Sequence, residues 1–80
     1  MSEVIEPETV TERVAVVVME LANGEEMTTR EIAEMTGLTY FGAWRLMNRL
    51  CRVPKLSLTY SSGRWSSILT ARQRGAATLR

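Results

Sequence analysis

Histidine is absent from the 80 residues, and cysteine occurs once, as Cys51. Without histidine the chain has no Ser-His-Asp triad, no Cys-His pair and none of the usual zinc ligand sets. A single cysteine excludes an intramolecular disulfide and an all-cysteine metal cage, and it suits a reducing cytosol. We therefore expect a cytoplasmic protein that is not an enzyme and holds no cofactor, metal or small-molecule ligand.

Long apolar runs are also missing, since no stretch approaches the ~20 residues that cross a bilayer. The acidic start, Met1 to Glu8, has no basic region of the kind that opens a secretory signal. A chain this short forms one domain at most. Both ends are poor in large apolar residues, so we expect a flexible acidic leader over 1–8, a folded domain over 9–69 and a flexible basic tail over 70–80.

Acidic residues are absent from the second half of the chain. All nine glutamates lie in residues 1–34 with only two arginines, a balance of −7. From Met35 onward there are eight bases and no acid, so the net charge of +1 hides two oppositely charged halves. This asymmetry favours a polyanionic partner, although eight bases on a solvated face remain the simpler alternative.

Two capping boxes predict where helices begin. They are Thr9-Val10-Thr11-Glu12 and Thr28-Thr29-Arg30-Glu31. The first box precedes an apolar stripe at helical spacing, and the helix that it opens ends at Asn23-Gly24. The stripe consists of Val10, Val14, Val17, Val18 and Leu21. The second opens a short helix that ends at Gly37, and its predicted inward residues are Ile32, Ala33 and Met35.

A third helix and two strands are predicted to follow. Thr39 can cap a helix that Pro54 stops, and the three-residue link from the second helix forms a helix-turn-helix unit. After Pro54 apolar residues alternate, which predicts one strand from Leu56 to Tyr60, a turn over 61–64 and a second strand over 65–69. The predicted fold class is α+β, with three helices and a C-terminal β-hairpin.

The third helix has an unusual predicted solvent face. Its inward side carries Ala43, Leu46, Met47 and Leu50, and its opposite side carries Phe41, Arg45, Asn48, Arg49 and Arg52. A solvated face normally mixes both signs of charge, but this face has no carboxylate. Arginine suits guanine, asparagine suits adenine, and an aromatic ring can contact a thymine methyl. For Phe41, packing against the hairpin or the Trp44 ring remains an alternative.

The pattern Ile32-Ala33, Gly37-Leu38 and Ala43 with Leu46, followed by a hairpin, resembles winged helix-turn-helix DNA-binding domains of small prokaryotic or phage transcriptional regulators. The resemblance implies a recognition helix over 39–52 in the major groove and a wing over 56–69 on the backbone or minor groove. It also implies a short strand near Met27 that pairs with the hairpin. Tyr40 is expected near the buried edge of this helix and to reach a phosphate through its hydroxyl. The DNA-binding residues expected from the resemblance are Thr39, Tyr40, Phe41, Arg45, Asn48, Arg49, Arg52, Lys55, Ser61, Ser62 and Arg64.

Sequence-specific binding of double-stranded DNA, by a nucleoid-associated transcriptional regulator, is therefore the leading hypothesis. The alternative is a winged-helix protein–protein interaction module in a larger assembly. Val16 and Met19 lie off the apolar stripe of the first helix, so they are either single surface residues or a homodimer contact. RNA binding is disfavoured, because the exposed aromatics lie on a helix rather than on a sheet.

Overall fold

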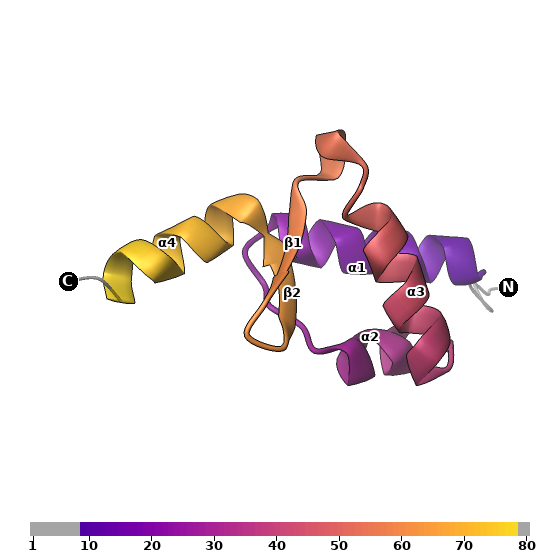
Figure 1. Cartoon of the computed structure of the whole chain (residues 1–80). Helices are drawn as coiled ribbons and strands as arrows, with labels where there is room; N and C mark the ends of the chain where they lie inside the picture. The colour runs from indigo at the N-terminus through magenta and orange to yellow at the C-terminus, as the bar shows by residue number, and fades with distance from the viewer. Residues whose placement is uncertain (1–8, 79–80) are drawn as a thin grey trace, which may run out of the picture.

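The computed structural model describes residues 9–78 and the surroundings of side chains up to residue 73, so the predicted leader over 1–8 and the last two residues of the predicted tail lie outside the described residues. The elements run in the order α1 (Val10–Ala22), α2 (Thr29–Thr36), α3 (Tyr40–Leu50), a 3-10 turn (Pro54–Leu56), β1 (Leu58–Ser61), β2 (Arg64–Ser67) and α4 (Ile68–Thr78). The fold is α+β, with three helices followed by a two-stranded antiparallel hairpin and then α4 (Figure 1).

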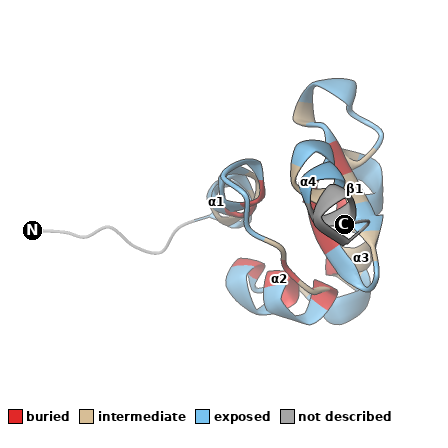
Figure 2. Ribbon diagram, turned by 90° about the vertical axis from the view of Figure 1, so that its left-hand side faces the viewer, coloured by how far each residue is buried: buried red, intermediate tan, exposed pale blue. Residues whose placement is uncertain are grey.

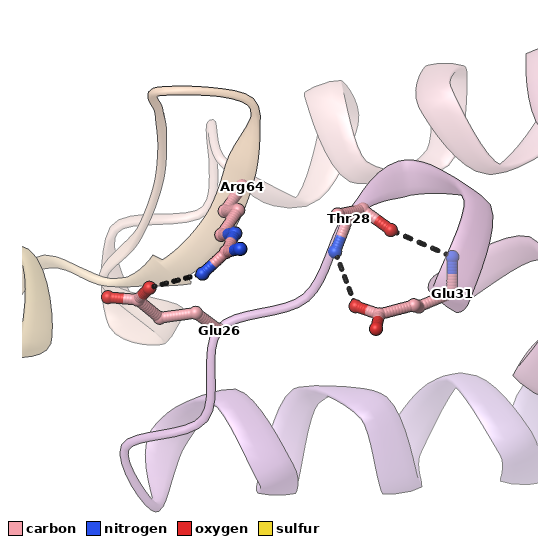
Figure 3. A network of polar contacts seen from close by, with 4 residues as sticks. All are labelled: Glu26, Thr28, Glu31 and Arg64. Carbon is pink, nitrogen blue, oxygen red and sulfur yellow. Dashed lines mark hydrogen bonds and ion pairs between the residues drawn. The ribbon is translucent and has the colours of Figure 1, made fainter.

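Both predicted capping boxes are confirmed. In α2, the Thr28 hydroxyl oxygen accepts from the Glu31 amide at 3.1 Å, and the Glu31 carboxylate accepts from the Thr28 amide at 2.9 Å (Figure 3). Thr9 and Glu12 make the same two bonds at the start of α1. Because these bonds join residues three apart, they satisfy the first orphan amides of each helix without help from the rest of the fold.

The core lies between α1, α2, α3 and the hairpin, where the buried residues face inward (Figure 2). It consists of Val17, Leu21, Met27, Ile32, Ala33, Ala43, Met47, Leu58 and Trp65. The predicted stripe of α1 is buried at its centre, but Val10 in the first turn is 47% exposed. The inward placement of Met35 was wrong, since it is 39% exposed and Thr36 is fully buried instead. Thr36 tolerates burial because its hydroxyl donates to the Ile32 carbonyl at 2.7 Å.

The hairpin turns at Ser62 and Gly63, which both have positive φ, as the tight two-residue turns of twisted hairpins require. The strand pairing predicted near Met27 is present as a single bridge, in which Met27 and Trp65 exchange backbone hydrogen bonds of 3.0 and 2.7 Å. This bridge fastens the segment before α2 to the second strand of the hairpin.

Several boundaries differ from the prediction. The third helix ends at Leu50 rather than 52, because the chain turns at residues 51–52 before Pro54, so Arg52 lies just after α3 and not within it. The hairpin is shorter than 56–69, because Leu56 lies in the 3-10 turn and β1 begins at Leu58. The second strand ends at Ser67, where the side-chain oxygen accepts from the Thr70 amide at 3.1 Å and so caps α4. Residues 68–69 are therefore helical rather than extended. The segment predicted as a flexible tail is helical through residue 78, so the described chain has four α-helices instead of three.

Candidate nucleic-acid interface

The outward side of α3 is as exposed as predicted. Its exposed residues include Phe41, Arg45, Asn48 and Arg49; together with Arg52, which is exposed in the turn just after the helix, we call them the α3 face. Ala43 and Met47, on the opposite side, are fully buried. Since nothing between residues 35 and 78 is acidic, the α3 face has no carboxylate of its own helix to neutralise its three guanidinium groups.

Phe41 does not pack into the fold. Its side chain is 64% exposed, and the guanidinium carbon of Arg45 lies 5.7 Å from the centre of its ring. The contact is a cation–π interaction one helical turn apart, and it restrains the long Arg45 side chain on the outer surface. The alternative, in which Phe41 packs against the hairpin or Trp44, does not hold in this structure.

Trp44, which flanks the α3 face, fixes α3 against the hairpin. Its ring centre lies 5.2 Å from those of both Tyr60 and Trp65, in edge-on arrangements that aromatic pairs favour. Trp65 in turn donates its indole N–H to the buried Thr29 hydroxyl at 2.9 Å. The aromatic cluster therefore couples α3, the hairpin and the start of α2, and it holds the α3 face in one orientation.

Asn48 makes a local hydrogen bond. Its side-chain amide donates to the Trp44 carbonyl, one turn earlier in the same helix, at 3.1 Å. The amide group retains one N–H hydrogen and its carbonyl oxygen, which are the donor and acceptor that a bidentate contact with adenine uses.

At the start of α3, the Thr39 oxygen accepts from the Gly42 amide at 3.0 Å, so Thr39 is the helix cap and also exposed. The placement of Tyr40 near the buried edge was wrong, because it is 60% exposed as the first residue of the helix. Lys55 and Ser62 are exposed, and Ser61 is half-buried.

Arg64, predicted as a contact at the hairpin tip, is held by the acidic half of the chain. Its guanidinium lies 3.6 Å from the Glu26 carboxylate, in a half-exposed ion pair that joins the hairpin to the segment before α2 (Figure 3). The resemblance implied that the segment near Met27 pairs with the hairpin, and the Met27–Trp65 bridge brings Arg64 and Glu26 together, but the ion pair itself was not predicted. A phosphate that contacts Arg64 would lie close to the Glu26 carboxylate, and the repulsion between the two anions weakens such a contact.

Two grooves that no sequence pattern indicated flank α1. The first, which we call the α1–α3 groove, holds about 470 Å³ and is lined by Val10, Thr11, Val14, Leu38, Gly42, Arg45, Leu46 and Arg49. The second lies between α1 and α2, holds about 290 Å³ and is lined by Glu20, Glu25, Glu26, Met27, Glu31, Glu34 and Met35. The first groove is thus bordered by arginines of α3 and the second by carboxylates of the acidic half of the chain.

Within residues 9–78, no group of histidine, cysteine or acidic side chains has the arrangement that could hold a metal ion. No helix in that same range is both long and apolar enough to cross a membrane. Val16 and Met19 are 40% and 63% exposed, so a homodimer contact there stays a prediction.

No family model, no curated protein and no solved structure matches this chain. Its function is therefore argued from the α3 face and the surfaces around it.

Proposed function

We propose that the chain is a winged-helix protein that binds double-stranded DNA in sequence-specific fashion, as a small nucleoid-associated transcriptional regulator. In this proposal α3 is the recognition helix in the major groove, and the hairpin of β1 and β2 is the wing on the backbone or minor groove. One observation carries the proposal: the α3 face combines three exposed arginines, an asparagine and an exposed phenylalanine with no carboxylate.

The residue types on the α3 face divide between reading bases and binding phosphates. Arg45 suits the two acceptors of guanine, Asn48 suits adenine, and the Phe41 ring suits a thymine methyl group. Arg45 is restrained by its contact with Phe41, so less side-chain entropy is lost when it binds. The proposed phosphate contacts are Arg52 and Lys55, which are both exposed and lie just after the C-terminal end of α3.

The charge distribution supports a defined orientation on a duplex. The carboxylate-bordered groove lies between α1 and α2, away from the α3 face, so a polyanion is attracted to one surface and repelled from the other. If the protein neutralises about five phosphates, the logarithm of the binding constant falls with the logarithm of salt concentration at a slope of about −4 to −5, since each contact contributes about −0.9.

The test is a titration of the full chain against a fluorescently labelled random-sequence duplex, followed by anisotropy at several salt concentrations. Arg52→Ala should weaken binding to every sequence and reduce the salt slope by about 1. Arg30→Ala is the matched control, because Arg30 is also an exposed helical arginine but lies on α2. A slope near zero, or equal effects of the two variants, would count against the proposal.

Specificity needs a second experiment, in which duplexes are selected from a random pool and then compared with scrambled versions. Arg45→Ala should cost about 1–3 kcal/mol on the selected duplex and relax the preference at one position. If the variant loses the same affinity for both duplexes, Arg45 binds the backbone and does not read a base.

The second candidate is a protein-interaction module. Two features favour it: the exposed Val16 and Met19 on α1, which an apolar partner surface could cover, and the carboxylate-bordered groove, which a basic partner could bind. A protein of this kind would show no binding to random duplex at low salt. If DNA binding is found, sedimentation with and without duplex will show whether a dimer forms, as the small contact area of one winged helix leads us to expect.

A further inference from the structure

The α1–α3 groove has an apolar floor that the described residues leave open. Val10 belongs to the apolar stripe of α1 but is 47% exposed, and Val14, Leu38 and Leu46 are only half-buried. Covering such surface is favourable by about 25 cal/mol for each Å² removed from water. The groove therefore fits a short apolar segment.

Arg45 and Arg49 also line this groove, so the occupant should be acidic as well as apolar. Both residues belong to the α3 face too, and a ligand in the groove would occupy guanidinium groups that face outward from α3. The groove and the α3 face are thus two adjoining surfaces that share two arginines.

Residues 1–8 of the same chain have this composition. The segment holds Glu3, Glu6 and Glu8 and no basic side chain, and its apolar pair Val4-Ile5 lies between the first two glutamates. We propose that the α1–α3 groove binds residues 1–8, with Val4 and Ile5 on the apolar floor and the glutamates beside Arg45 and Arg49. Docking itself does not depend on DNA binding, but its effect on DNA rests on the proposed function.

The chain is long enough for this contact. Thr9 caps α1 and the next residue already lines the groove, while Val14 lies four residues further, about 6 Å along the helix. The five steps from Ile5 to Val10 span up to about 16–18 Å when extended. A short tether also holds the segment at a millimolar effective concentration, so weak contacts suffice.

A docked segment and a DNA duplex would compete for Arg45 and Arg49. Binding of DNA then requires the undocked form, and the apparent affinity is reduced by the fraction of molecules in that form. If about 80–90% of molecules are docked at low salt, DNA binds about 5–10-fold more weakly than it would without docking. High salt screens the glutamate–arginine pairs and should reduce the difference.

Docking is tested directly without DNA, by methyl NMR on the full chain at low salt. We expect nuclear Overhauser effects between the Ile5 methyl groups and those of Val14 or Leu46. Glu3→Gln/Glu6→Gln/Glu8→Gln should weaken them. Their complete absence in the unmodified chain would overturn the proposal. In a mixture of labelled and unlabelled chains, effects that arise only between different molecules would overturn it as well, because the occupant would be a second copy.

The competition is tested by DNA binding of the same triple variant. Affinity should rise about 5–10-fold at low salt relative to Glu20→Gln/Glu25→Gln/Glu34→Gln, a control that removes the same charge from exposed glutamates bordering the other groove. Equal gains in the two triple variants would show a net-charge effect and refute competition. If neither variant nor the unmodified chain binds DNA, the proposed function fails, while the NMR contacts still decide whether the groove is occupied.

Discussion

The buried hydrogen bond between Trp65 and Thr29 offers the sharpest test of how the hairpin is held. The indole N–H donates to the Thr29 hydroxyl at 2.9 Å, and the two residues are 1% and 3% exposed. Thr29→Val keeps the shape of the side chain but removes the acceptor. A buried donor left without a partner costs about 1–3 kcal/mol. We expect the free energy of unfolding to fall by that amount.

The assay is urea and thermal unfolding followed by circular dichroism. In a domain of this size, each kcal/mol lowers the melting temperature by about 4–8 °C. Thr36→Val is the matched control: it also removes a buried threonine hydroxyl, but that hydroxyl donates to a carbonyl inside α2 and accepts only a long, 3.4 Å bond from the part-buried Leu38 amide, and the helix keeps its backbone bonds. We expect a smaller loss from Thr36→Val.

A double-mutant cycle with Trp65→Phe isolates the bond itself. In the Phe background no indole donor remains, so Thr29→Val should cost little. If Thr29→Val costs the same in both backgrounds, or if it costs no more than Thr36→Val, the hydrogen bond does not fasten the hairpin and the reasoning is refuted.

Three further experiments test local features of the fold. Gly37 and Gly63 both have positive φ, +79° and +80°, so an alanine is strained at either position. Of these two glycines, only Gly37 has a neighbour that an added Cβ would meet, the Arg13 guanidinium at 3.3 Å. Gly37→Ala should therefore lower the melting temperature more than Gly63→Ala. Ser66 has a fully buried hydroxyl with no partner among the described residues, so Ser66→Ala should leave stability unchanged or raise it in urea unfolding, and a loss above about 1 kcal/mol would contradict this. Burial raises the pKa of the Cys51 thiol, so at mildly alkaline pH a thiol reagent should react more slowly with the native chain than with the unfolded one. Because the pKa of the Cys51 thiol is higher in the folded chain than in the unfolded one, the neutral thiol favours the folded state. This contribution to the free energy of unfolding is present at neutral pH and is lost as the pH rises through the folded-state pKa.

Features that depend on residues close in sequence could be predicted. The caps at Thr9, Thr28 and Thr39 join residues three apart, so their residue types suffice to mark the helix starts. The α3 face follows from helical periodicity, because buried Ala43 and Met47 fix which side points outward.

Features that depend on packing could not be predicted. Met35 is more apolar than Thr36, yet Thr36 takes the buried position, which it tolerates since its hydroxyl is satisfied within its own helix. The Arg64–Glu26 ion pair depends on strand pairing between distant segments. The α1–α3 groove exists only once two helices are packed. The start of α4 was missed because its cap, Ser67, is also the last residue of β2 and precedes few large apolar residues.

The most direct test of DNA binding through α3 is NMR mapping of the isotope-labelled full chain during titration with duplex DNA. We predict that signals of Phe41, Arg45 and Asn48 shift first and most, while those of Glu20 and Glu34 near the carboxylate-bordered groove stay in place. Shifts confined to α1 and α2, or no shifts at low salt, would contradict the proposal.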